Sequence, residues 1–161
     1  MGGDEQIRPM PEHTAISVSS LERSIEFYTT VFGLQVNRTI ESRPESRLGD
    51  IVGLPGCTAR IAHLGPAQAG GAGTTDEGEP LLVIELFEYQ DPAGKPLARE
   101  RTQADLGISH IGFRSPDARG DYRRLVERGV ECLSEPVEFR PGVWVFYFRG
   151  PDGEVCEMRQ S

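Results

Sequence analysis

Short stretches of alternating apolar and polar residues, each followed by residues with helical spacing, give the chain its main pattern. The alternation over residues 13–18 predicts a strand. Ile16 and Val18 lie on one face of this strand, and His13 begins the other face. The apolar face is the one that we expect a neighbouring helix to cover.

A helix is predicted directly after this strand, from Ser19 to the residue before Gly33. Ser19 and Glu22 have the spacing of a capping box, which satisfies free amides in the first helical turn. Gly33 suits the left-handed position that ends many helices. The apolar residues within this interval recur at helical spacing and form one stripe, namely Leu21, Ile25, Tyr28 and Phe32.

Three further strands are predicted in the first half of the chain. The first two cover residues 34–40 and 58–64, and the second of these contains His63. Between them, the charged and then Gly/Pro-punctuated residues 41–56 are expected to form a long excursion. The glycine-rich residues 65–79 predict a mobile loop before the last strand.

The last strand of this half, residues 80–88, is a nearly continuous apolar run with Glu85 at its centre. A lone buried carboxylate costs several kcal/mol unless a cation, a proton or hydrogen bonds compensate it. Glu85 therefore either turns outward into water or points into a site that needs a negative charge. By strand parity, Ile84 and Leu86 lie on the opposite face, which a helix would cover.

The second half of the chain repeats this order of elements. Residues 108–113 predict a strand that carries His110 on the face opposite its apolar residues. A helix is predicted to have Pro116 at its first position and to end at Gly129. Three strands follow, over residues 130–133, 143–148 and 154–159, and the turn at residues 150–153 joins the last two.

Corresponding positions of the two halves carry the same polar residue types. Each half begins with a histidine, His13 or His110, and reaches its helix-ending glycine 20 or 19 residues later. Each half ends on a strand with a central glutamate, Glu85 or Glu157. This repeat predicts an α+β fold built on a repeated βαβββ unit. The predicted parts are a flexible tail, a first module, a linker and a second module, at residues 1–10, 11–89, 90–106 and 107–161.

Strand parity places these two histidines and two glutamates on the faces that point away from the helices. All four side chains then face the concavity that the sheets form. Two imidazoles and two carboxylates suit a divalent metal that keeps positions for water or substrate. Such a site would also compensate the charge of Glu85.

Composition limits the classes of partner. The chain has 161 residues and a formal net charge of −8, which argues against nucleic acid and anionic membranes as partners. No apolar run approaches the roughly 20 residues that a membrane span needs, and residues 1–8 lack the apolar segment of a signal peptide. The three cysteines, Cys57, Cys132 and Cys156, are scattered and typical of buried thiols in a reducing cytosol. We therefore expect a cytoplasmic protein that acts on a small molecule.

Several motifs spread over residues 11–159: His13 with Ser20–Tyr28 and Phe32–Leu34, Val83–Leu86, Ser109–Phe113, and Phe148–Gly153 with Glu157. On these motifs the chain resembles the vicinal oxygen chelate superfamily, which includes glyoxalase I, methylmalonyl-CoA epimerase, extradiol dioxygenases, and the fosfomycin- and bleomycin-resistance proteins. The resemblance implies paired βαβββ modules whose curved sheets enclose a metal cleft, and a homodimer. The cleft is closed either within one chain or by two chains that exchange modules.

The resemblance also implies roles for residues. The glyoxalase-type metal set falls on His13, Glu85, His110 and Glu157, with Ni, Co, Zn, Mn or Fe as the ion. Glu85 or Glu157 would be the general base of a lyase or isomerase that removes a proton beside a carbonyl held by the metal. Tyr147 and Trp144 lie on opposite faces of one strand, and either could line the cleft. The residues expected to contact substrate are His63, Arg114, Tyr147 and Arg159.

Two other functions stay open at this point. A non-haem Fe(II) ring-cleaving or related dioxygenase would use His13, His110 and Glu157, with Glu85 off the metal. A metal-free small-molecule-binding or antibiotic-resistance protein would use the cleft only to sequester its ligand. Metal analysis of protein purified without chelator separates these alternatives.

Overall fold

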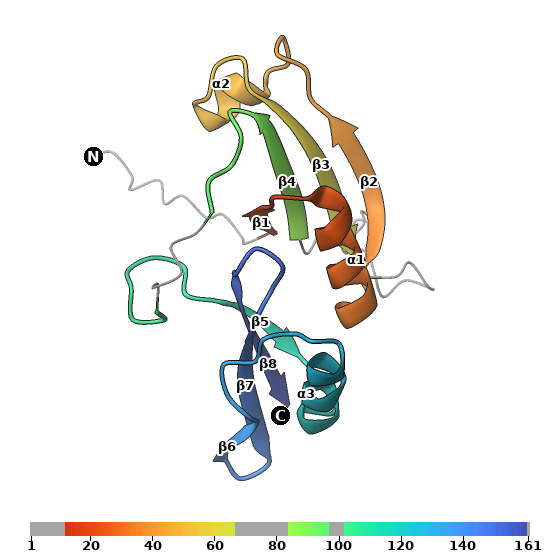
Figure 1. Ribbon diagram of the computed structural model, residues 1–161, viewed down its shortest axis with the longest axis vertical. Coiled ribbons are helices and arrows are strands. Elements are labelled where there is room, and N and C mark those ends of the chain that lie inside the picture. Colours follow the sequence, from red (N-terminus) through yellow and green to blue (C-terminus); the bar gives the residue numbers. More distant parts are fainter. Residues whose placement is uncertain (1–11, 67–83, 97–101, 161) are drawn as a thin grey trace, which may run out of the picture.

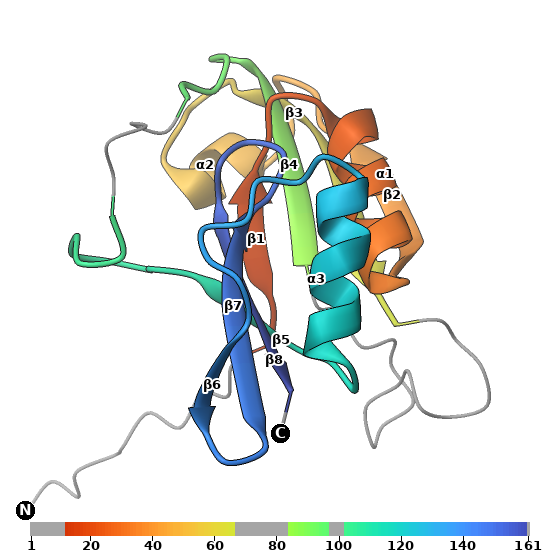
Figure 2. The ribbon, with the colours of Figure 1, turned by 60° about the horizontal axis from the view of Figure 1, so that its bottom comes forward.

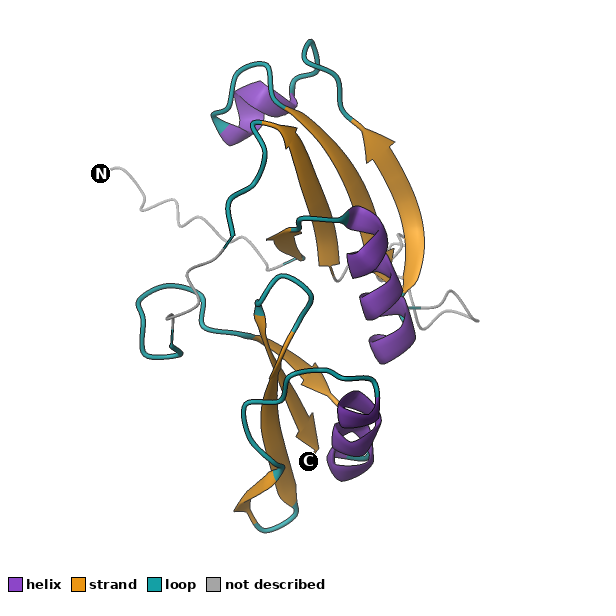
Figure 3. Cartoon of the chain, in the orientation of Figure 1, coloured by secondary structure: helices purple, strands orange, loops and turns teal. Residues whose placement is uncertain are grey.

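The computed structural model describes residues 12–66, 84–96 and 102–160 of the chain. These residues form two four-stranded sheets, each packed against a helix (Figures 1 and 3). The strand order is the same in both halves, so the predicted α+β fold of paired βαβββ modules is confirmed. The predicted tail lies outside the described residues, and the predicted module boundaries stay a prediction.

The first sheet has the strand order β1-β4-β3-β2. Its strands are β1 (Thr14–Ser17), β2 (Gln35–Glu41), β3 (Thr58–Gly65) and β4 (Ile84–Asp91). β1 pairs with β4 in parallel, and the other neighbours are antiparallel. Helix α1 (Leu21–Phe32) follows β1, and the short helix α2 (Leu48–Val52) lies within the excursion between β2 and β3. The first residues predicted for β4, up to residue 83, lie outside the described residues.

The second sheet has the corresponding order β5-β8-β7-β6. Its strands are β5 (Ile111–Arg114), β6 (Val137–Arg140), β7 (Val143–Arg149) and β8 (Val155–Gln160), and its helix is α3 (Ala118–Glu127). β5 pairs with β8 in parallel, as β1 does with β4. No helix among the described residues is long and apolar enough to cross a membrane.

One strand of the second module differs from the prediction. Where the pattern predicts a strand at residues 130–133, the structure has a single bridge from Cys132 to Phe148. Pairing then breaks and resumes as β6, a strand that the prediction lacked. Pro136 lies in the break and has no amide hydrogen to donate to a neighbouring strand. The alternation of apolar Val137 and Phe139 with polar neighbours is the signal that indicates β6.

The helix starts also differ from the prediction, whereas the glycine stops do not. The cap of α1 is Ser20 rather than Ser19, because the Ser20 hydroxyl accepts the Arg23 amide at 3.3 Å. The cap of α3 is Asp117, whose side chain accepts the Gly120 amide, so Pro116 lies before the helix. Gly33 and Gly129 have φ angles of 67° and 74°, in the left-handed region that favours glycine.

Each module has its own apolar core between its sheet and its helix, and the predicted faces are confirmed. In the first core, Ile16, Val18, Ile84 and Leu86 are buried against α1. In the second core, the buried residues of the sheet are Phe146, Phe148, Cys156 and Met158, and those of α3 are Ala118 and Leu125. The residues between these positions on each strand therefore point away from the helices.

Helix α1 also packs against the second module, and this contact joins the two cores. The ring of Phe32 stacks on Phe113 with 3.9 Å between centroids and 22° between planes. Phe27 and Val31 pack against the second core as well. The Arg128 guanidinium donates to the Thr30 carbonyl at 2.9 Å, and α1 and α3 lie on the same side of the molecule (Figures 1 and 2).

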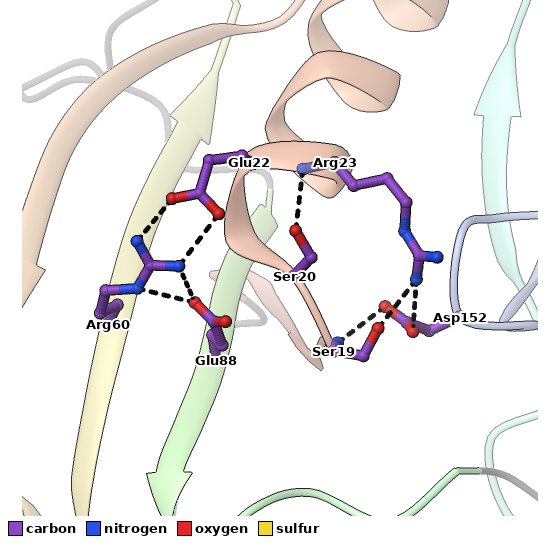
Figure 4. Close-up of polar contacts among 7 residues, drawn as sticks. All are labelled: Ser19, Ser20, Glu22, Arg23, Arg60, Glu88 and Asp152. Atoms are coloured by element: carbon purple, nitrogen blue, oxygen red, sulfur yellow. Dashed lines mark hydrogen bonds and ion pairs between the residues drawn. The ribbon is translucent and has the colours of Figure 1, made fainter.

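Two polar clusters hold the start of α1 (Figure 4). Arg60 of β3 forms ion pairs with Glu22 of α1 and Glu88 of β4, and its hydrogen bonds lower the pKa of the Glu22 carboxyl to about 2. On the other side, Arg23 and the Ser19 amide both donate to Asp152, in the turn between β7 and β8. The first cluster fixes the helix to its own sheet, and the second fixes it to the other module.

Buried contacts extend this second attachment. The hydroxyl of Tyr28, which is fully buried, donates to Glu154 at 2.7 Å, and the Asp152 amide donates to the other oxygen of that carboxylate. Burial raises the pKa of the Glu154 carboxyl, because removal from water disfavours its charged form. The joint between the modules therefore contains a carboxylate with two donors as well as stacked rings.

Candidate metal centre

Glu85 lies between two histidines of the first module. The register of β3 and β4 pairs His63 with Glu85, and the two side chains approach to 3.1 Å between Nε2 and Oε1. His13 directly precedes β1, the parallel neighbour of β4, and its Nε2 lies 3.2 Å from Glu85 Oε2. The Glu85 side chain is 14% exposed. The open question about Glu85 is thus resolved: its carboxylate faces away from α1 and contacts imidazoles.

Glu157 has the corresponding place in the second module. Its Oε2 lies 3.1 Å from His110 Nε2 and accepts the hydroxyl of Tyr147 at 2.9 Å. The rings of His110 and Tyr147 meet edge to face, with 5.1 Å between centroids. Burial raises the pKa of the Tyr147 hydroxyl, and the hydrogen bond to Glu157 raises it further by a smaller amount.

The strand registers show that His63 and Tyr147 are equivalent residues. β3 places His63 opposite Glu85, and β7 places Tyr147 opposite Glu157. A histidine and a tyrosine have no common sequence signal, so the repeat alone gave His63 no counterpart. Both side chains are partners of the carboxylate in their own module.

The second nitrogen of each predicted metal-binding histidine is also held. His13 Nδ1 lies 3.1 Å from a carboxylate oxygen of Glu12, and His110 Nδ1 lies 2.8 Å from the Ser109 hydroxyl. In both cases the partner is the residue immediately before the histidine. A hydrogen bond at Nδ1 fixes the ring and leaves Nε2 as the atom that can bind a metal. The prediction from sequence lacked both partners, although a polar residue before each histidine is a readable signal.

Of the two aromatic residues predicted to lie on opposite faces of β7, Trp144 and Tyr147, one packs under the helix and the other faces Glu157. Trp144 packs against the second core, with the Arg119 guanidinium 4.6 Å from the centre of its ring. Tyr147 is therefore the residue on the site face, where it contacts Glu157. The other two predicted substrate contacts, Arg114 and Arg159, are exposed and are neighbours in the pairing of β5 with β8.

The four predicted metal ligands form two pairs, His13 with Glu85 and His110 with Glu157. Across residues 12–66, 84–96 and 102–160, no group of three or more His, Cys, Asp or Glu side chains is arranged to hold one ion. An open cleft of about 2050 Å³ between the modules includes His110, but its lining among these residues includes neither Glu85 nor Glu157. A single chain therefore presents two separate histidine–glutamate pairs, each of which we call a half-site of the candidate metal centre.

The donor set of each half-site fits a divalent ion. An imidazole nitrogen and a carboxylate oxygen 3.1–3.2 Å apart have about the spacing of adjacent ligands around one ion, with bonds of about 2.1 Å. Imidazole with carboxylate accepts several first-row metals. His13 adds a stronger indication. Its ring lies between two carboxylate acceptors, Glu12 at Nδ1 and Glu85 at Nε2, and a cation bound between Nε2 and Glu85 would satisfy the second of these contacts.

Paired βαβββ modules, each with a histidine–glutamate pair at the same place, define a glyoxalase-type fold. The chain matches the model of the Glyoxalase/Bleomycin resistance protein/Dioxygenase superfamily over residues 11–158. It is 30% identical over 158 residues to a 2-epi-5-epi-valiolone epimerase from Actinomyces sp. This match covers 91% of this chain and 76% of that relative. The chain therefore belongs to the Glyoxalase/Bleomycin resistance protein/Dioxygenase superfamily.

Solved structures show the same fold. A glyoxalase family protein from Bacillus cereus matches with a TM-score of 0.77 and 22% identity, over 99% of this chain and 98% of that one. The trypanothione-dependent glyoxalase I of Leishmania major matches with a TM-score of 0.59 and 21% identity, over 96% of this chain and 87% of that one. An epimerase and a glyoxalase I thus occur among the proteins that this chain resembles.

Proposed function

We propose that this protein is a metal-dependent isomerase or lyase of the glyoxalase type, which removes a proton from a carbon next to the carbonyl of a small molecule. The observation that carries the proposal is that His13 and His110 have equivalent contacts at both ring nitrogens. In each module a side chain holds Nδ1, and Nε2 points at the carboxylate of a glutamate. The similarity to an epimerase supports the isomerase form.

The proposed ligands are His13, Glu85, His110 and Glu157, with Ni, Co, Zn, Mn or Fe as the ion. When bound, a divalent ion supplies Lewis-acid polarisation of the substrate carbonyl, which acidifies the neighbouring C–H bond. The chain's own carboxylates then serve as the base. Glu85 and Glu157 are mostly shielded from water, with side chains 14% and 17% exposed, so their charge is weakly screened.

His63 and Tyr147 would position the two bases. The His63 ring contacts Glu85 Oε1 and the His13 ring contacts Oε2, so each oxygen of this carboxylate has an imidazole partner. The Tyr147 hydroxyl donates to Glu157 Oε2 and competes with His110 for the same oxygen. Glu85 is thus held at both oxygens, whereas Glu157 is held at one. On this basis Glu157 has the greater freedom to turn toward a substrate carbon and return the proton.

We further propose that a homodimer forms the complete site. Because each chain presents two half-sites, the pair His13 and Glu85 of one chain would face the pair His110 and Glu157 of a second chain. Closed two-fold dimers are the commonest protein assemblies, and their symmetry would make two identical sites.

Solvent exchange tests the proposed reaction. The metal-loaded protein is incubated in deuterated water with 2-epi-5-epi-valiolone, an α-keto thiohemiacetal or an epimer of an acyl-CoA. We expect deuterium at the carbon next to the carbonyl of at least one of them, and loss of this exchange in Glu157→Gln. Glu41→Gln, at the exposed end of β2, is the matched control and should keep full exchange. Absence of exchange with every substrate contradicts the proposal.

Mixing two variants tests the shared site. His13→Ala and His110→Ala are each expected to lose the metal. After the two are unfolded together and refolded, about half of the dimers are mixed and each carries one intact site, so about a quarter of all sites should regain metal. A site within one chain predicts no recovery. Size-exclusion chromatography with light scattering confirms the dimer, and a monomer that binds metal stoichiometrically contradicts this assembly.

A further inference from the structure

Two arginines lie side by side on the site face of the second sheet. The parallel pairing of β5 with β8 makes Arg114 and Arg159 direct neighbours. Both are exposed, and within the described residues neither guanidinium makes an ion pair or a hydrogen bond. Other arginines of this acidic chain are paired, as Arg23 is with Asp152 and Arg60 is with Glu22. Two like charges directly opposite each other on neighbouring strands destabilise a sheet.

This arginine pair is the next cross-strand pair on the same face of the sheet as the proposed metal half-site. Glu157 precedes Arg159 by two residues on β8, so both side chains point to the same face at about 7 Å spacing. That face is opposite the one that Cys156 and Met158 bury under α3. A molecule held at Glu157 can therefore reach the arginine pair with a group two or three bonds away.

The residue between His110 and Arg114 on the same face is a glycine. Gly112 pairs with Glu157, and a methyl group built on it would meet no atom within 4 Å. The surface beside the Glu157 carboxylate is thus open, without a side chain between the half-site and the guanidinium groups. A ligand has space to lie along β5 from His110 to Arg114.

The corresponding cross-strand pair of the first module is uncharged. β1 and β4 pair Ser17 with Phe87 at the place that Arg114 and Arg159 occupy in the second module. Phe87 also stacks on Tyr89, with 5.8 Å between centroids. One side of the completed site would therefore be cationic and the other neutral and aromatic.

We propose that Arg114 and Arg159 bind an anionic group, a phosphate or a carboxylate, on the substrate whose carbonyl lies at the metal half-site. Paired guanidinium groups present several N–H donors in a planar arrangement that matches these oxyanions. The bound anion also neutralises the repulsion within the pair. This inference rests on the proposed function for the position of the carbonyl, but the anion site itself needs no metal and no turnover.

Three hydroxyketones that differ in charge test the site. Dihydroxyacetone phosphate, hydroxypyruvate and dihydroxyacetone carry a phosphate, a carboxylate and no charge. Each is titrated by calorimetry into the full-length, metal-free protein. We expect at least one charged probe to bind about tenfold or more tighter than dihydroxyacetone, and this preference to weaken with salt. Tighter binding of dihydroxyacetone phosphate identifies a phosphate site, and tighter binding of hydroxypyruvate identifies a carboxylate site.

Substitution assigns the preference to the pair. The double variant Arg114→Gln with Arg159→Gln should bind all three probes equally. Arg123→Gln, an exposed arginine on α3, is the matched control and should keep the preference. Equal binding of the three probes to the unaltered protein overturns the proposal, and so does a preference that survives in the double variant.

A measurement on the unaltered protein covers the case in which the double variant does not fold. Inorganic phosphate is titrated into the isotope-labelled, metal-free chain, and backbone amide shifts are followed by NMR. Saturable shifts at Gly112, Arg114 and Arg159 support the site, and shifts confined to other residues overturn it. Because this readout involves no proton exchange at carbon, anion binding without deuterium exchange would reject the proposed reaction and leave this inference standing.

Discussion

The two modules share a scaffold and differ in what they place around the same central carboxylate. Glu85 contacts two imidazoles, whereas Glu157 contacts one imidazole and a phenol. One row further along the strands, the first module has Ser17 and Phe87 and the second has Arg114 and Arg159. A repeated unit thus keeps its histidine–glutamate pair and varies the neighbours. The constant residues suit a shared metal, and the variable ones suit the two ends of an asymmetric substrate.

The largest expected difference separates metal ligands from positioning residues. His13→Ala and His110→Ala each remove one of four proposed ligands, so each should weaken metal binding by at least about 1,000-fold. His63→Ala and Tyr147→Phe remove only a partner of a carboxylate and should cost about 10- to 100-fold. Competition with a chelator of known affinity measures all four. Equal losses in the four variants would contradict this division of roles.

The joint between the modules is the next target. Phe32→Ala removes the ring that stacks on Phe113, and we expect a loss of about 2–3 kcal/mol in the free energy of unfolding. Because the ring couples the two cores, urea unfolding of this variant should broaden or separate into two transitions. Phe139→Ala is the control, since that ring on β6 is 78% exposed and should change stability by less than about 0.5 kcal/mol. An unchanged transition in Phe32→Ala would show that the modules do not depend on this contact.

A smaller effect distinguishes the supports of the two histidines. Ser109 is half-buried beside His110, whereas the Glu12 carboxylate beside His13 is 78% exposed. We therefore expect Ser109→Ala to weaken metal binding by about tenfold and Glu12→Gln by only a few-fold, because solvent screens an exposed contact. Calorimetric titration of metal into each variant measures the difference. If Glu12→Gln is the more damaging of the two, the charge of the Glu12 carboxylate beside His13 matters more than the burial of the contact does.

The smallest expected effect is on the pH dependence of stability, through Glu154, the carboxylate that the second module contributes to the joint. The raised pKa of Glu154 means that the folded state holds its proton more tightly than the unfolded state does. The stability from this group is present below its ordinary pKa of 4.5 and is lost as the pH rises through the folded-state pKa. Glu154→Gln should remove this loss, so its stability relative to the unaltered protein should improve from pH 4.5 to 7.

Thermal unfolding of Glu154→Gln at several pH values measures this dependence. The control is Glu26→Gln, an exposed position on α1, which should leave the pH dependence as it is. A variant at Glu154 with the same slope as the unaltered protein would show that the carboxyl titrates alike in both states.

Strand parity was the part of the fold and site that the sequence could predict. The faces that carry Ile16, Leu86 and Met158 are buried as expected, because burial of alternate residues follows directly from the period of a strand. The repeat predicted that His13, Glu85, His110 and Glu157 share one concavity, whereas the contacts in the structure join them as two pairs, His13 with Glu85 and His110 with Glu157.

Other features depend on how elements meet in space. The attachment of Asp152 and Glu154 to α1 joins residues more than 120 positions apart, and no local signal indicates it. The separation of the proposed metal ligands into two pairs has the same origin, since parity fixes the face of a residue and not the distance between two sheets. The equivalence of His63 and Tyr147 required the registers of β3 with β4 and of β7 with β8.

Helix α1 has a consequence for how the chain is made. Its Phe27, Val31 and Phe32 complete a core whose other residues lie between positions 113 and 158. During synthesis the first module leaves the ribosome with this apolar face uncovered, until most of the second module has followed. Exposed apolar surface on a growing chain favours association with other chains and with chaperones. The last 50 residues therefore complete the second module and also shield the first from aggregation.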